Sequence, residues 1–157
     1  MQDVDLFSAS VEFGIRIGLN LIGISVIAWG WSPAARFWSR RFSGTNLSPG
    51  RSWLVAFLGL LIWTCASAGT EVLVRTATSL EFGDFALAWR GWTTFAGGFG
   101  LALLVTPVII RRVVVTTSKL ELSYRPRLKI VFGTLGPLFA LAVVIGAAWQ
   151  WIYFPKL

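Results

Sequence analysis

The chain has 157 residues, 55% of them hydrophobic, and its mean hydropathy of +0.71 accompanies nine Trp and twelve Phe. A soluble domain of this length buries too little surface to hide so many apolar side chains, so composition excludes a soluble globular protein. The net charge of +7 could attract nucleic acid, but the basic residues lie just outside the apolar stretches, where membrane topology requires them. Nucleic acid is therefore not expected as a partner.

Four apolar stretches, each close to twenty residues long, fill most of the chain. As a helix rising ~1.5 Å per residue, each can cross a hydrocarbon core of ~30 Å. The polar segments between them are too short to form a separate aqueous domain with its own core. The sequence therefore predicts an all-α integral membrane protein, a single membrane domain over residues 1–157 with four transmembrane helices at about 12–31, 53–72, 92–110 and 130–153.

Basic residues concentrate in two loops, one after the first span and one after the third. They are Arg36, Arg40, Arg41 and Arg51 in the former and Arg111, Arg112, Lys119, Arg125, Arg127 and Lys129 in the latter. Loops rich in Lys and Arg stay in the cytoplasm, so both termini are predicted to lie on the extracytoplasmic side. The expected location is a bacterial-type inner (plasma) membrane, crossed several times, with an organellar membrane as the alternative.

The same two loops are expected to contact anionic phospholipids, because basic side chains beside a span are attracted to charged headgroups. Pro33 is expected to end the first helix, and aromatic and basic side chains then alternate as in a segment lying on the membrane surface. The residues assigned to lipid contact are Arg36, Arg40, Arg41, Arg111, Arg112, Arg125, Arg127 and Lys129.

Two local patterns give further predictions. Trp63 lies in the middle of the second span, so its indole N–H needs an acceptor from a neighbouring helix or a bound molecule. Between residues 119 and 125, apolar and polar side chains alternate, which predicts a short extended segment before Pro126.

The first span carries two special faces. Polar residues recur every four positions on one face, whereas small residues occupy nearly the opposite face, and four-residue spacing places side chains on one side of a helix. Small residues permit close helix approach, and polar ones in hydrocarbon require partners. This helix is therefore predicted to lie between the other spans and a second protein. The polar face comprises Glu12, Arg16 and Asn20, and the small face comprises Gly14, Gly18 and Ser25.

Glu71 and Arg75, at the end of the second span, are predicted to share a leaflet with Glu12, Arg16 and Asn20 as one intramembrane polar cluster. One interpretation is an ionic staple between the first two helices, centred on Arg16 and Glu71. The other is the lining of a proton or ion path, since charges within a membrane often mark transport.

Small residues also mark the third and fourth spans as packing helices. Gly97, Gly98 and Gly100 form a patch in the third, and Ala142 with Gly146 forms a pair in the fourth. All five are predicted to lie at helix–helix or partner interfaces.

The residue inventory excludes most catalytic chemistry. The chain has no His and a single Cys, so His-ligated haem, His-containing zinc motifs, thiolate clusters and His-dependent nucleophile pairs are excluded. Seven carboxylates, none paired within a span, leave no acidic cluster for Mg²⁺. No catalytic residue, metal or cofactor is predicted, and the chain is not expected to be an enzyme; a bound lipid, quinone or pigment stays open.

These patterns favour a non-catalytic accessory or structural subunit of a larger membrane protein complex, which contributes to assembly, packing and lipid organisation. The expected partners are other membrane subunits and anionic phospholipids. The alternative is a small oligomeric channel or transporter whose polar outer vestibule is formed by the charged cluster. A lipid-active membrane enzyme is the third hypothesis.

Overall fold

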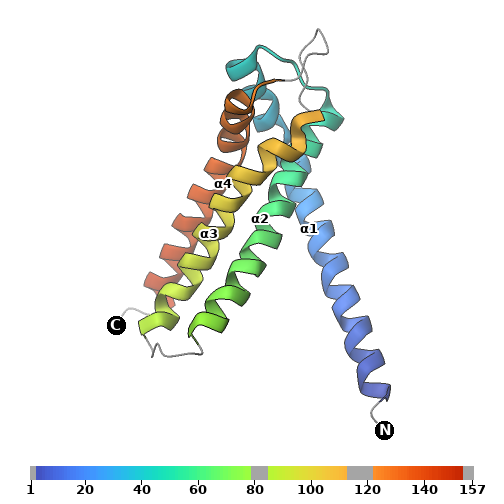
Figure 1. Cartoon of the computed structure of the whole chain (residues 1–157), viewed down its shortest axis with the longest axis vertical. Coiled ribbons are helices and arrows are strands. Elements are labelled where there is room, and N and C mark those ends of the chain that lie inside the picture. Colours follow the sequence, from blue (N-terminus) through green and yellow to red (C-terminus); the bar gives the residue numbers. More distant parts are fainter. Residues whose placement is uncertain (1–2, 79–84, 113–121, 154–157) are drawn as a thin grey trace.

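A computed structural model describes residues 3–78, 85–112 and 122–153 of the chain, and every regular element in these ranges is helical. The long helices are α1 (Asp3–Ser43), α2 (Pro49–Thr78), α3 (Phe85–Ile109) and α4 (Tyr124–Tyr153), with a short 3₁₀ turn, η1 (Ile110–Arg112), after α3 (Figure 1). All four long helices are long and apolar enough to cross a membrane. The chain is thus a multi-pass membrane protein, and each predicted span lies within one helix except at Ile110, which opens η1.

The first helix is much longer than predicted, because Pro33 does not end it. At 41 residues α1 extends over roughly 60 Å, about twice the thickness of a hydrocarbon core. Proline at position 33 cannot donate to the carbonyl of Trp29, which would break the helix if that carbonyl stayed unpaired. The Ser32 hydroxyl donates to the Trp29 carbonyl at 3.0 Å and replaces the missing bond. The helix therefore continues to Ser43.

The extended segment predicted before Pro126 is wrong where the structure describes it. Leu122 and Ser123 are irregular, and α4 already begins at Tyr124. Residues 119–121 lie outside the described ranges. Proline is tolerated in the first turn of a helix, where its missing N–H has no intrahelical partner, so Pro126 lies in the first turn of α4 rather than after a strand.

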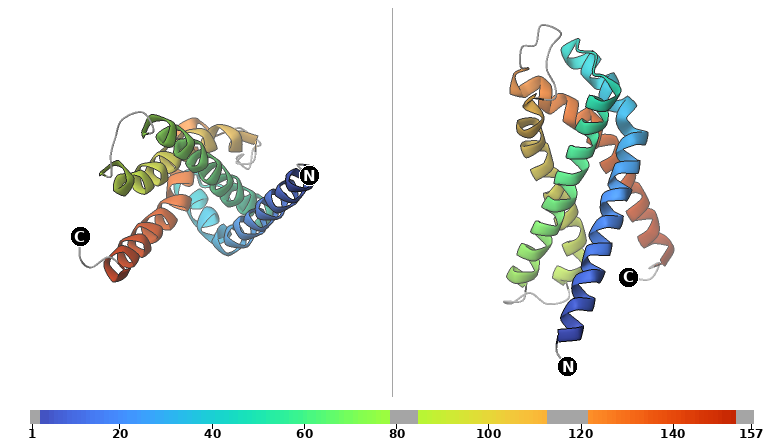
Figure 2. Two further views of the ribbon diagram at one scale, coloured as in Figure 1. Left: turned by 90° about the horizontal axis from the view of Figure 1, so that it is seen from below. Right: turned by 90° about the vertical axis from the view of Figure 1, so that its right-hand side faces the viewer.

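All four helices meet at one end of the molecule, which consists of the last turns of α1 and α3 and the first turns of α2 and α4 and is termed the basic end (Figure 1). The start of α1 and the finish of α4 lie at the opposite end. α2 packs most extensively against α3, and next comes the packing of α1 on α2. Away from the basic end, α1 diverges from α2 and from α4, which leaves its amino-terminal half standing apart (Figures 1 and 2).

The connection between α1 and α2 is short and held by polar contacts. Gly44 ends α1 with φ of 66°, a left-handed conformation that glycine adopts without strain, and its N–H donates to the Arg40 carbonyl at 3.0 Å. Ser48 caps α2, since its hydroxyl accepts from the Arg51 N–H at 3.4 Å and Pro49 opens the helix. The buried Ser39 hydroxyl donates to the Thr45 carbonyl at 3.0 Å, which fastens the loop to α1.

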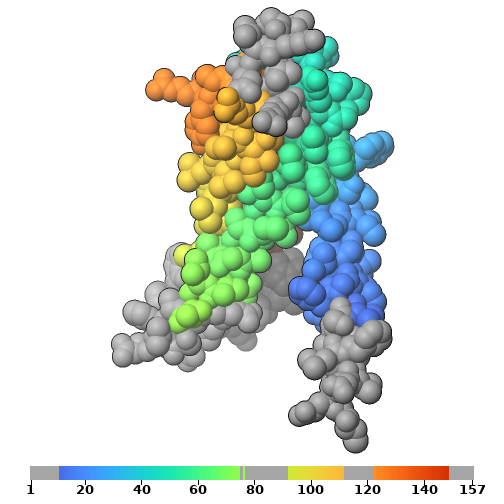
Figure 3. Space-filling model, turned by 45° about the vertical axis from the view of Figure 1, so that its right-hand side comes forward, coloured from blue at the N-terminus to red at the C-terminus, as the bar shows by residue number. Residues whose placement is uncertain are grey.

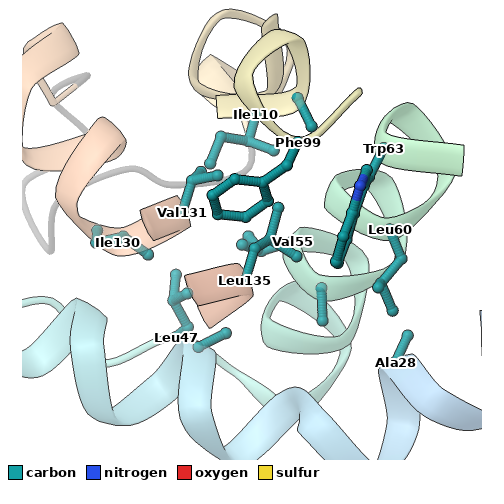
Figure 4. Packing of buried hydrophobic residues seen from close by; sticks show 13 residues of the cluster. Ala28, Leu47, Val55, Leu60, Trp63, Phe99, Ile110, Ile130, Val131 and Leu135 are labelled. Atoms are coloured by element: carbon teal, nitrogen blue, oxygen red, sulfur yellow. The ribbon is translucent and has the colours of Figure 1, made fainter. Parts of the chain in front are cut away.

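The buried core lies between α2, α3 and α4, with a smaller contribution from α1 (Figure 4). Trp63 of α2 is 8% exposed, and its ring centroid lies 5.0 Å from that of Phe95, 5.3 Å from that of Phe99 and 6.0 Å from that of Phe139. Its indole N–H donates to the Phe95 carbonyl of α3 at 3.4 Å. The acceptor that the sequence required for Trp63 is therefore the backbone of a neighbouring helix.

Candidate functional site

The amino-terminal half of α1, residues 11–23, is the part of the described chain with the least internal packing. Every residue from 11 to 23 is exposed except Gly18, which is half-buried, whereas the most apolar stretch of each of the other three long helices is 28% buried. Figure 3 shows this segment separated from α2 by open space. Its side chains are exposed on every side of the helix.

The polar face of this segment forms its own ion pair. Arg16 Nη2 lies 2.6 Å from Glu12 Oε1, and the two side chains are 73% and 64% exposed. The predicted staple from Arg16 to Glu71 is wrong, because α1 has already diverged from α2 at this level. Asn20 is exposed, one turn nearer the core.

The remaining members of the predicted polar cluster belong to α2. Glu71 is half-buried and has partners of its own. Arg75 lies in α2, but its side chain is outside the described part of the chain. The structure therefore does not bring the five predicted residues together: Glu12 and Arg16 form a pair on α1, separate from Glu71.

The predicted small face of α1 is open to its surroundings. A side chain added at Gly14 or Gly18 would meet no atom of the described chain within 4 Å. Ser25, further along the same face, is half-buried, and its carbonyl accepts from the Trp53 indole N–H at 3.3 Å. Contact with α2 thus begins near Ser25, and the glycines before it face outward.

The small residues of α3 and α4 divide differently. At Gly98 an added Cβ would lie 2.7 Å from the backbone of Ser67, so α2 and α3 approach closely there, and at Gly97 it would lie 3.2 Å from the Thr70 side chain. A Cβ added at Gly146 would lie 3.5 Å from the Trp92 ring, whereas one added at Gly100 would meet no atom within 4 Å. Ala142 is half-buried. Gly97, Gly98 and Gly146 therefore pack inside this chain.

The basic residues at the basic end fall into two groups, of which the first is structural. Arg127 is 8% exposed; its Nη1 donates to the Pro107 carbonyl at 2.8 Å and its Nε to the Ser123 carbonyl at 3.2 Å. The Pro107 carbonyl is one of the last four of α3, which have no partner within the helix, so Arg127 caps α3 from α4. This structural role replaces the lipid contact predicted for Arg127.

Arg36 and Arg40 also have partners within the chain. Arg36 Nε donates to Ser52 Oγ at 3.2 Å across the α1–α2 junction. Arg40 donates to Asn46 Oδ1 through Nε at 3.0 Å and Nη2 at 2.8 Å. These two arginines fix the loop between α1 and α2.

The second group is exposed to the surroundings. Arg41, Arg125 and Lys129 are exposed, and Lys129 Nζ lies 5.8 Å from the centroid of the Phe42 ring, within the range of a cation–π contact. Arg111 is exposed as well and has a partner, whereas the side chain of Arg112 lies outside the described part.

An aromatic junction between α1 and α4, which sequence reasoning missed, lies beside the Phe42 ring that Lys129 contacts. An added Cβ at Gly133 would lie 2.6 Å from the Trp38 ring, so the indole packs directly on the α4 backbone. The Trp31 indole N–H donates to the Thr134 carbonyl at 2.6 Å. Pro137 cannot donate to the carbonyl of Gly133, the residue before Thr134, and this weakens α4 at that turn. The proline was therefore the signal in the sequence for this contact.

Within the described ranges, no group of three or more His, Cys, Asp and Glu side chains could hold a metal ion. The geometry thus offers two surfaces for function, the amino-terminal half of α1 and the exposed cations of the basic end. A scan against protein-family models, a search of curated proteins and a search of solved structures each found no match.

Proposed function

We propose that the protein is a non-catalytic accessory subunit of a larger membrane complex and that it binds its neighbours through the amino-terminal half of α1. In this proposal both termini lie on the extracytoplasmic side of a bacterial-type inner membrane, as the distribution of basic residues favours. The basic end then faces the cytoplasm.

The observation that supports this proposal best is the open small-residue face of α1. Glycines spaced by four residues in a transmembrane helix permit another backbone to approach closely, yet no part of the described chain approaches Gly14 or Gly18. In contrast, Gly97 and Gly98 of α3 already have α2 against them. A helix from another subunit could approach Gly14 and Gly18 closely, as α2 approaches Gly98 within the chain.

The exposed ion pair of Glu12 and Arg16 points in the same direction. Charged side chains in a transmembrane helix are costly when they face lipid and usually face protein or water. Both side chains are more than half exposed on a segment that does not touch the rest of the bundle. A neighbouring subunit would cover them and supply further hydrogen bonds.

The substitution Gly18→Ile tests this surface. Isoleucine would block close approach of a second backbone, but nothing in the described chain stands within 4 Å, so the four-helix unit is expected to insert and fold normally. We expect the variant to lose co-purifying subunits in mild detergent while its expression and melting temperature stay at wild-type values.

Two matched variants serve as controls. Gly69→Ile adds the same side chain at an exposed glycine of α2 with equally open surroundings, so partners should be retained. Gly98→Ala drives a Cβ into the Ser67 backbone, so folding itself should suffer. Retention of every partner by Gly18→Ile would show that this face is not the interface.

The same purification addresses the alternative of a small oligomeric channel or transporter. In that case the wild-type protein would run as a symmetric homo-oligomer, and neutralising Glu12 or Arg16 would change ion flux in liposomes without releasing any unlike subunit. Co-purification of unlike subunits and no flux is the outcome expected for an accessory subunit.

A further inference from the structure

The exposed Lys129 of α4 lies over the Phe42 ring of α1, and the exposed Arg41 and Arg125 are, respectively, adjacent to Phe42 and one turn before Lys129. We propose that Arg41 and Phe42 of α1, together with Arg125 and Lys129 of α4, form a binding site for the phosphate headgroup of an anionic phospholipid. This site is separate from the partner surface on α1 and does not depend on the accessory-subunit proposal.

The geometry holds cations from two helices at one place. The Phe42 ring stacks on Trp38 with centroids 5.1 Å apart and planes 9° apart, and Trp38 rests on the α4 backbone at Gly133. The Nζ atom of Lys129 lies over the Phe42 ring, 5.8 Å from its centroid. Arg125, one turn before Lys129, lies on the same face of α4. The half-buried Trp38 indole thus joins the part of α1 that carries Phe42 to the part of α4 that carries Lys129.

The positive charge at the start of α4 favours binding of an external anion. Arg125, Arg127 and Lys129 occupy the first two turns of α4, whose first turn contains no acidic residue. The amino-terminal end of a helix already carries partial positive charge, so cations placed there are unfavourable unless an anion lies nearby. Backbone carbonyls neutralise the effect for Arg127. In the described ranges no carboxylate pairs with Arg41, Arg125 or Lys129.

The surroundings favour a phospholipid over free phosphate. Phe132 follows Lys129 by three residues toward the span and is 56% exposed, and Phe37 precedes Phe42 by five residues and is 57% exposed. The cations are therefore continuous with exposed apolar side chains on the same two helices. A phospholipid presents a phosphate and an acyl chain in the same order along the bilayer normal, whereas free phosphate would use the cations alone.

The test is a titration of the purified protein with phosphatidylglycerol in phosphatidylcholine nanodiscs, in which native mass spectrometry counts the lipids retained. A basic side chain near an anionic leaflet contributes about fivefold in affinity, so Arg125→Gln with Lys129→Gln is expected to weaken retention roughly 25-fold. Lys129→Arg keeps the charge and is expected to retain the lipid. Both substituted side chains are exposed, and an unchanged melting temperature verifies the fold.

Arg51→Gln is the matched control, because this exposed arginine lies at the same end, in the first turn of α2, a helix that contributes no residue to the proposed site. It is expected to retain phosphatidylglycerol as the wild type does. Equal loss from Arg51→Gln would reveal a diffuse attraction and overturn the site. Wild-type retention by the double variant would overturn it too, as would displacement of the lipid by excess inorganic phosphate.

Discussion

Arg127 differs in its burial from the other basic residues that the structure describes in the predicted loop. Its guanidinium reaches the Pro107 carbonyl of α3 and the Ser123 carbonyl just before α4 and is shielded from the surroundings, whereas Arg125, two positions earlier, is exposed. The sequence presents both residues as members of one basic cluster. Helical phase separates them, since two positions correspond to about 200° around the axis and place the side chains on opposite faces.

We expect Arg127→Met to destabilise the protein by roughly 1.5–3 kcal/mol, because hydrogen bonds from a charged donor to the carbonyls of Pro107 and Ser123 are lost. The measurement is the thermal unfolding midpoint in detergent. Arg125→Met, the same change at an exposed position of the same helix, should alter stability by less than about 0.5 kcal/mol. Equal midpoints for both variants would contradict the capping role.

At the level of the elements, prolines and glycines determine how the helices bend and touch. Pro33 lies inside α1, Pro107 inside α3 and Pro137 inside α4. Side chains donate to carbonyls at or beside each position that the prolines leave unpaired: Ser32 to Trp29, Tyr124 to Leu104, and Trp31 to Thr134. The last two join different helices, so the weakened turns serve as attachment points between them.

Gly133→Ala tests the junction of α1 with α4. Its Cβ would lie 2.6 Å from the Trp38 ring, so the indole must shift, and we expect a loss of roughly 1–3 kcal/mol in the free energy of unfolding. Gly136→Ala, less than one turn away, would meet Phe132 at an ordinary 3.8 Å and is expected to be neutral or stabilising, since alanine favours helix by up to about 1 kcal/mol. Measured side by side, the melting temperature should fall for Gly133→Ala and stay level or rise for Gly136→Ala. A stabilising effect of Gly133→Ala would refute the contact.

Across the whole molecule, hydrophobic length determined the number of spans, and the four predicted segments lie in long helices except at Ile110, which opens η1. The sequence could not show that α1 passes Pro33, because that depends on the local bond from Ser32. It also could not show that Arg16 binds Glu12 instead of Glu71, since the pairing follows from the angle at which α1 leaves α2. Periodicity identifies a face of a helix, whereas the neighbour of that face depends on the tertiary arrangement.

The orientation of the bundle is a separate prediction, drawn from the basic loops. In a Cys65→Ala background, a cysteine at Gly50, exposed at the basic end, is expected to react with a membrane-impermeant thiol reagent only after the cytoplasmic face is opened. A cysteine at Thr76, exposed near the end of α2, is expected to react in intact cells. Labelling of position 50 in intact cells would show that the protein has the opposite orientation.

The proposal that this chain works as one subunit among unlike membrane subunits can be tested on the intact particle. Its most direct test is purification of the wild-type protein from its native membrane in mild detergent, followed by mass spectrometry of everything retained and a measurement of the mass of the particle. We expect unlike membrane subunits in fixed stoichiometry and a particle mass well above 17.3 kDa. A particle that contains this chain alone, as a monomer or a homo-oligomer, would contradict it.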